Sequence, residues 1–150
     1  MKSSHRSFLT LAALAAGCAL FLGGQAHAAT NSIVVPVSGT AGGAAFSGTA
    51  TVETTLVLDE FGGAPSVIVS VHLNNVVARG ATGPLLSGSG EAVLIRPLAA
   101  SDSVDVSAAL DAPGNAPGTA TRTATAHLAL RLDPVTGAAL GATAVFGAAL

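Results

Sequence analysis

The chain has 150 residues, a formal net charge of −2 and a single cysteine, Cys18, so no disulfide can form within it. Two of its six basic residues, Lys2 and Arg6, lie near the N-terminus, which leaves four arginines against eight acidic residues in the rest of the chain. Nucleic acids and anionic membrane surfaces are bound by clustered Lys and Arg, so we expect the protein to bind neither.

The first 28 residues have the organisation of a cleaved signal peptide. A basic n-region is followed by an uncharged apolar run over residues 8–22 and by the small-x-small sequence Ala26-His27-Ala28. We predict that residues 1–28 are removed, with the mature protein starting at Ala29 or Thr30, and that the protein is exported to the periplasm or the extracellular medium. The apolar run is shorter than the ~20 residues that span a membrane, so we do not expect a retained anchor.

A lipoprotein is the alternative interpretation of this segment, with Cys18 as the lipidated residue. A lipobox usually carries Leu three residues before the Cys, but this chain has Ala15 there and Leu14 one place earlier. The residues after Cys18 also continue the hydrophobic run instead of starting a polar tether. Cleavage after Ala28 is therefore the interpretation that we adopt.

Residues 29–150 have a length suited to one domain. They are dominated by period-two alternation, which predicts half-buried strands. We expect a first strand over 33–37 and a second over 46–58, followed by a break at Gly62-Gly63-Ala64-Pro65 that makes a hairpin. The inward row of the second strand is predicted to be Phe46, Gly48, Ala50, Val52, Thr54, Leu56 and Leu58, and that of the third to be Val67, Val69, Val71 and Leu73.

The second half of the chain repeats this pattern. A short strand at Glu91 to Arg96 is apolar on both faces, which predicts a central position in a sheet. A loop is expected over 113–118, a hairpin turn over 133–137 and a final strand over 140–146. Two further inward rows are predicted, the first formed by Val104, Val106, Ala108 and Leu110, the second by Ala124, Ala126, Leu128, Leu130 and Leu132.

The fold class is therefore all-β, a single antiparallel β-sandwich or small β-barrel of about seven strands. Phe46 and Phe146 are expected to pack at its centre, because a core rich in Ala and Gly needs its few large side chains. A transmembrane barrel is the alternative for an exported β-protein. Such barrels carry girdles of aromatic residues, and this chain has no Trp or Tyr, so we expect the mature form not to be embedded in a membrane.

No set of residues in the sequence forms a catalytic, cofactor or metal site. His72 and His127 are predicted to face outward, and a zinc or copper site needs three or four ligands; two histidines with a carboxylate such as Glu53 would make only a weak site. Gly88-Ser89-Gly90 lacks the spacing of a nucleophile elbow. We therefore expect solvated histidines and no enzymatic activity.

Threonines are the most distinctive candidates for a binding surface. If the strands that carry them are neighbours, they build a flat array of hydroxyl and methyl groups suited to a regular surface such as a polysaccharide or ice; otherwise they reflect the high β-propensity of Thr. The candidates are Thr49, Thr51, Thr55, Thr119, Thr121, Thr123 and Thr125.

The first strand is the candidate for interaction through a sheet edge. The sequence Ile33-Val34-Val35 is apolar and therefore prone to association at a sheet edge. After Lys2 the chain has no Lys with which to protect such an edge, although Pro36 protects the first strand in part. We expect self-association or strand addition through residues 32–38, and hence a non-catalytic binding or structural module. The alternative function is a carrier that holds a small apolar ligand in a barrel pocket.

Overall fold

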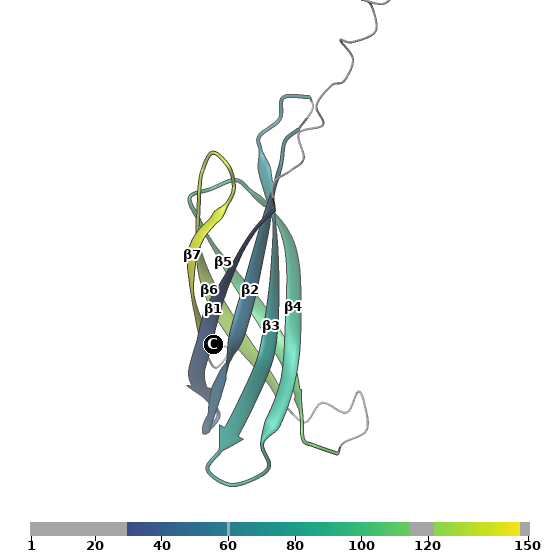
Figure 1. Ribbon diagram of the computed structural model, residues 1–150, viewed down its shortest axis with the longest axis vertical. Coiled ribbons are helices and arrows are strands. Elements are labelled where there is room, and N and C mark those ends of the chain that lie inside the picture. Colours follow the sequence, from purple (N-terminus) through teal and green to yellow (C-terminus); the bar gives the residue numbers. More distant parts are fainter. Residues whose placement is uncertain (1–29, 60, 115–121, 148–150) are drawn as a thin grey trace, which may run out of the picture.

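The computed structural model of the protein describes residues 30–59, 61–114 and 122–147. They form a closed barrel of seven strands in the order β1-β2-β3-β4-β5-β6-β7 (Figure 1). The predicted all-β class is confirmed, and of the two predicted architectures the barrel is the one observed. The strands are β1 (Thr30–Ala41), β2 (Ala44–Val57), β3 (Ser66–Gly80), β4 (Leu86–Pro97), β5 (Ser101–Asp111), β6 (Arg122–Leu132) and β7 (Ala139–Gly147).

Several predicted elements compare directly with these strands. The first strand and the strand at 91–96 are longer than predicted, and the loop at 113–118 lies mostly outside the described residues. The predicted signal peptide, residues 1–28, lies outside them as well. Within the described part of the chain there is no helix with the length and apolar character needed to cross a membrane.

We call the hydrogen-bonded pairing between two neighbouring strands of the barrel a seam, and two of the seven seams are short. Strands β1 to β4 pair along most of their lengths, and so do strands β5 to β7. In contrast, among the described residues β4 pairs with β5 only through Ser87–Ser89, and β1 pairs with β7 only through Val37–Gly39, where the two strands run parallel. The barrel therefore consists of a four-stranded sheet and a three-stranded sheet joined at two corners. In Figure 1, β5 to β7 run obliquely behind β1 to β4.

Both corners lie at the same end of the barrel. Ser38, Ser47, Val77 and Ser87 form one cross-strand row that links the two seams through the four-stranded sheet. We call this the paired end; it carries the β1–β2 turn and the β3–β4 loop, at the bottom of Figure 1. The opposite end, which carries the β2–β3, β4–β5 and β6–β7 connections, is the splayed end, because β1 and β7 separate toward it (Figure 1).

Glycines allow the two sheets to meet at the corners. A Cβ atom added to Gly39 of β1 would overlap the carbonyl oxygen of Phe146 on β7. A Cβ atom added to Gly88 of β4 would overlap the carbonyl oxygen of Ala109 on β5. Only a residue without a side chain lets the two backbones approach this closely. The sequence thus sets the positions of both corners.

The core is built from the predicted inward rows. Every residue of the rows at 67–73, 104–110 and 124–132 is buried, which confirms those predictions. Phe46 and Phe146 are also buried, and their ring centroids lie 5.4 Å apart with the planes tilted by 36°. In the predicted row of the second strand, Phe46, Ala50, Val52 and Thr54 are buried and Gly48 and Leu56 are partly buried, whereas Leu58 lies beyond β2 and is exposed.

Two polar side chains accept hydrogen bonds from backbone N–H groups at the splayed end. Thr54 is buried, and its hydroxyl accepts a hydrogen bond from the backbone N–H of Ala139 at 3.1 Å, which links β2 to β7 across the interior. In the β6–β7 turn, the Asp133 carboxylate accepts hydrogen bonds from the N–H groups of Thr136 at 3.0 Å and Val135 at 2.7 Å. These backbone hydrogen bonds, that from Thr136 first and that from Val135 second, lower the pKa of Asp133.

Candidate functional site

The most prominent features of the surface are two stretches of strand edge whose backbone hydrogen-bonding groups have no partner strand on one side. Among the described residues, β7 pairs with β1 only at Val37–Gly39, so residues 30–36 have a partner strand on the β2 side alone. Likewise, residues 91–97 of β4 pair with β3 but lie beyond the short seam with β5 and beyond Gly90, which the β5 backbone still approaches closely. We call these stretches the β1 edge and the β4 edge. Both present backbone N–H and C=O groups on the side that has no partner strand.

Exposed apolar side chains accompany both edges. On the outer face, Val34 of the β1 edge is 65% exposed, and Val93 and Ile95 of the β4 edge are 62% and 72% exposed. On the inner face, Val35 and Leu94 pack against the core. Proteins commonly protect an edge with lysine, and neither edge contains one. These edges therefore combine free backbone groups with accessible apolar surface.

The central position predicted for the strand at 91–96 is wrong. The sequence is apolar on both faces, but β4 is the last strand of the four-stranded sheet, and residues 91–97 lie on its edge. Leu94 is apolar because it packs against the core, whereas Val93 and Ile95 are apolar and exposed. An apolar run thus cannot distinguish a strand covered on both faces from an edge strand whose outer face stays uncovered.

The inner rows of the two edges end in polar side chains. Asn31 belongs to the inner row of the β1 edge, and its Oδ1 atom is buried with no hydrogen-bond partner among the described residues. Arg96 belongs to the inner row of the β4 edge, and its Nε atom lies 3.6 Å from Oδ2 of Asp102 on β5. This ion pair spans the gap between the sheets beyond the short β4–β5 seam.

The threonine candidates do not form one array. Thr49, Thr51 and Thr55 lie on β2, which pairs with β1 and β3, whereas Thr123 and Thr125 lie on β6, which pairs with β5 and β7. The two groups are therefore on different sheets, and the neighbouring strands that one continuous array requires are not found. Thr119 and Thr121 lie outside the described residues.

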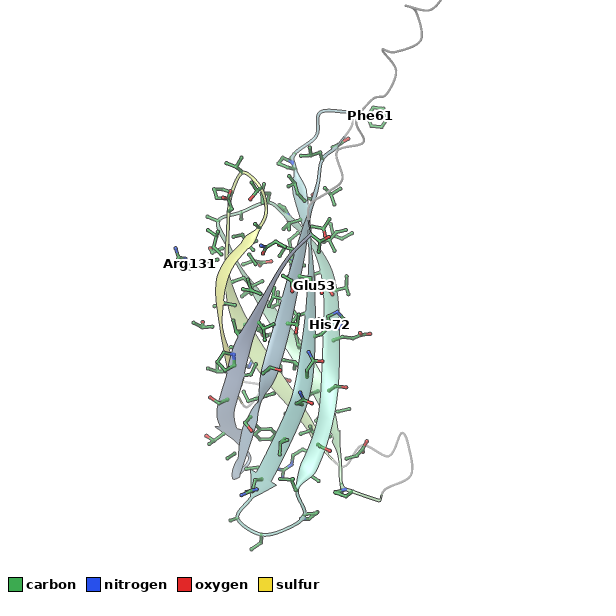
Figure 2. All side chains as sticks on the ribbon, in the orientation of Figure 1. Glu53, Phe61, His72 and Arg131 are labelled. Atoms are coloured by element: carbon green, nitrogen blue, oxygen red, sulfur yellow. The ribbon has the colours of Figure 1, made fainter. Side chains whose placement is uncertain are left out.

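The two histidines face outward, as predicted, but from different sheets. His127 Nδ1 lies 2.6 Å from Oδ1 of Asp105, its cross-strand neighbour on β5. His72 lies on β3 in the four-stranded sheet, on the same outer face as Glu53 (Figure 2). Its carboxylate neighbour is Glu91 on β4, 3.6 Å away, and not Glu53. Within the described residues, no group of three or more His, Cys, Asp or Glu side chains is placed to hold a metal ion.

Ser70, His72 and Glu91 have the relative order of a hydrolase triad. The Oγ atom of Ser70 lies 3.1 Å from His72 Nε2, on the opposite side of the ring from Glu91. No pattern along the sequence indicates this group, because it depends on cross-strand register. Acyl transfer also needs backbone N–H groups free to bind an oxyanion. Ser70 lies between Glu53 on β2 and Val93 on β4, so the surrounding N–H groups belong to the sheet ladders. The group is a cross-strand cluster of hydrogen-bonding side chains on the outer face of the four-stranded sheet.

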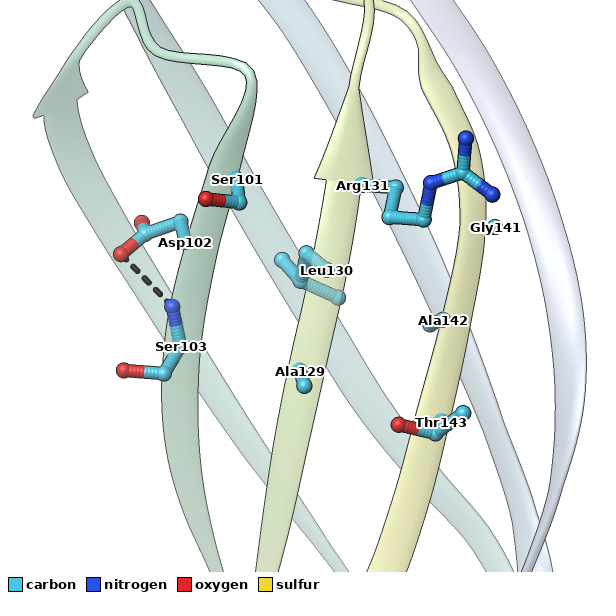
Figure 3. Close-up of a pocket in the computed structure, with 9 residues that line it drawn as sticks. All are labelled: Ser101, Asp102, Ser103, Ala129, Leu130, Arg131, Gly141, Ala142 and Thr143. Carbon is cyan, nitrogen blue, oxygen red and sulfur yellow. Dashed lines mark hydrogen bonds between the residues drawn. The ribbon is translucent and has the colours of Figure 1, made fainter.

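An open concavity of about 800 Å³ lies on the outer face of the three-stranded sheet (Figure 3). Its floor is the cross-strand row Ser103, Ala129 and Thr143. The Arg131 side chain extends toward Gly141, its cross-strand neighbour on β7 (Figure 3). The hydroxyls and the guanidinium can donate hydrogen bonds to an anionic or polyhydroxylated ligand. No pattern in the sequence predicts this concavity, because small residues on three separate strands create it.

In comparisons with known proteins, no family model, no curated protein and no solved structure matches the chain. The geometry of its own surface is therefore the basis for a proposal about its function.

Proposed function

We propose that the protein is exported and acts as a non-catalytic binding or structural module that works by pairing at the edge of its four-stranded sheet. The observation that carries this proposal is the shortness of the β1–β7 seam, which leaves the β1 edge with a partner strand on one side only. Residues 37 and 38 already pair with β7. The contact expected over residues 32–38 therefore narrows to residues 32–36.

The packing of the interior favours this module over a carrier of apolar ligands. A carrier needs a concave site of about 300–1,000 Å³ lined mainly by apolar side chains. Here the inward side chains of both sheets form one continuous core, in which Phe46 and Phe146 pack against each other at the paired end. The large concavity at Ser103, Ala129 and Thr143 is on the outside of the sheet and is partly polar.

Sedimentation velocity over a range of concentrations tests edge pairing. Wild-type protein should associate as its concentration rises, and Val34→Lys should weaken that association because it places a charge on the outer face of the β1 edge. Val34 is preferable to Val35 as a site because Val35 packs against the core. Val135→Lys is the matched control, since Val135 is 78% exposed and lies in the β6–β7 turn.

Two results would count against this function. If wild-type protein is monomeric at every concentration and both variants behave alike, edge pairing is wrong and the apolar-ligand carrier becomes the better proposal. Export has its own test, the intact mass of protein recovered from its host. That mass should correspond to a chain beginning at Ala29 or Thr30, and a diacylglycerol adduct on Cys18 would instead establish a lipoprotein.

A further inference from the structure

We infer that the partner of the β1 edge is the β4 edge of a second copy of this chain, so that copies add head to tail through their four-stranded sheets. This inference rests on the proposed edge pairing and names its occupant. The two edges are the opposite borders of one sheet. Neighbouring strands in that sheet are antiparallel throughout, so β1 and β4 run in opposite directions. Placing β4 of one copy beside β1 of the next therefore continues the antiparallel pattern.

The two edges also have similar lengths and occupy the same cross-strand rows of the sheet. The row that contains Thr30 on β1 runs through Thr55 and Ile68 to Ile95 on β4. The row that contains Val34 runs in the same way to Glu91. Both unpaired stretches thus occupy the splayed half of the sheet, and a partner strand can run along either of them without meeting a seam.

In one register of this pairing, apolar side chains of the two copies meet on both the outer and the inner face of the joined sheet. If Val34 lies opposite Val93 of the second copy, the exposed apolar side chains of the two outer faces meet, and Ile33 lies opposite Leu94 on the inner face. The same register places Asn31 opposite Arg96, and side chains directly opposite each other have Cβ atoms about 4.5–5.5 Å apart. Shifting the register by two residues in one direction places Arg96 opposite Ile33 instead.

The amide of Asn31 and the guanidinium of Arg96, at the ends of the two edges, are complementary hydrogen-bonding groups, which favours a copy of this chain as the occupant. The Oδ1 atom of Asn31 is buried within its own chain, so this side chain must turn outward to meet Arg96 of a second copy. The guanidinium of Arg96 carries five N–H donors, more than its contact with Asp102 uses. The β1 edge contains no charged residue and the β4 edge only Glu91 and Arg96, so no like charges oppose each other in this pairing.

A charge exchange across the expected contact tests the inference. The double variant Val34→Lys/Val93→Lys places Lys opposite Lys at each contact, whereas Val34→Lys/Val93→Glu places Lys opposite Glu. Both side chains are mostly exposed, so the substitutions leave the core intact. We expect the Lys/Glu variant to associate about tenfold more tightly than the Lys/Lys variant in sedimentation velocity. Val34→Lys/Val135→Glu, which has the same composition as the Lys/Glu variant, should stay as dissociated as Val34→Lys alone.

The outcomes separate this inference from the proposed function. If Val34→Lys weakens association but the Lys/Lys and Lys/Glu variants sediment alike, the β1 edge pairs with another surface and the head-to-tail inference is wrong. If only substitution of Val93 weakens association, two β4 edges pair with each other, which also overturns it. If wild-type protein does not associate at any concentration, the proposed function fails together with the inference.

Discussion

Replacing Gly88 by alanine tests whether a glycine closes the corner between β4 and β5. The added Cβ would overlap the carbonyl oxygen of Ala109 and lie 2.9 Å from its carbonyl carbon, so one strand must move. Adding a methylene to a well-packed site typically costs about 1–3 kcal/mol. Because the obstacle here is backbone, we expect about 3 kcal/mol of strain. Lower flexibility of the unfolded chain offsets this by about 0.4–1 kcal/mol, leaving a net loss of about 2 kcal/mol.

Thermal unfolding followed by circular dichroism measures this loss, and Gly141→Ala is the matched control. A loss of about 2 kcal/mol should lower Tm by about 8 °C in a domain of this size. A Cβ at Gly141 would meet no atom within 4 Å, so that variant should gain about 0.4–1 kcal/mol and unfold slightly above wild type. If Gly88→Ala unfolds at or above the wild-type temperature, the close approach of β4 and β5 is wrong.

Three further predictions concern the core and the splayed end. Phe46→Ala should cost about 3–5 kcal/mol in urea denaturation because the ring is buried; a midpoint close to wild type would contradict the packing of this ring in the core. Thr54→Val removes the buried acceptor of the Ala139 N–H and should cost about 1–3 kcal/mol, whereas Thr55→Val, in the outer row, should change the free energy of unfolding little. The folded-state pKa of Asp133 is lowered, chiefly by the hydrogen bond from the Thr136 N–H, so its stabilising effect is present above the ordinary value of 3.8 and is lost as the pH falls through the folded-state pKa. The stability difference between wild type and Asp133→Asn should therefore shrink on acidification, and a difference independent of pH would contradict this assignment.

Much of the local structure was predictable because buried and exposed side chains alternate along each strand. The inward rows at 67–73, 104–110 and 124–132 follow from the period of two in a strand, and all are buried. The turn at 133–137 follows from its Asp, Pro and Gly, which set its hydrogen bonds locally. The sequence did not predict a break in this alternation at the start of β7. A register shift between β6 and β7 places Ala139 in the interior and leaves Leu140 exposed.

The sequence by itself determined that this chain forms strands and which side chains most of those strands bury, because these properties depend on neighbours along the chain. Only the tertiary structure decided which strands border each other. That choice placed the threonines of β2 and β6 on separate sheets, brought Ser70, His72 and Glu91 together, and made β4 an edge. The physical reason is that side-chain alternation is the same for every pairing of strands. The lengths of the seams depend instead on where backbones from distant parts of the chain can approach, as they do at Gly39 and Gly88.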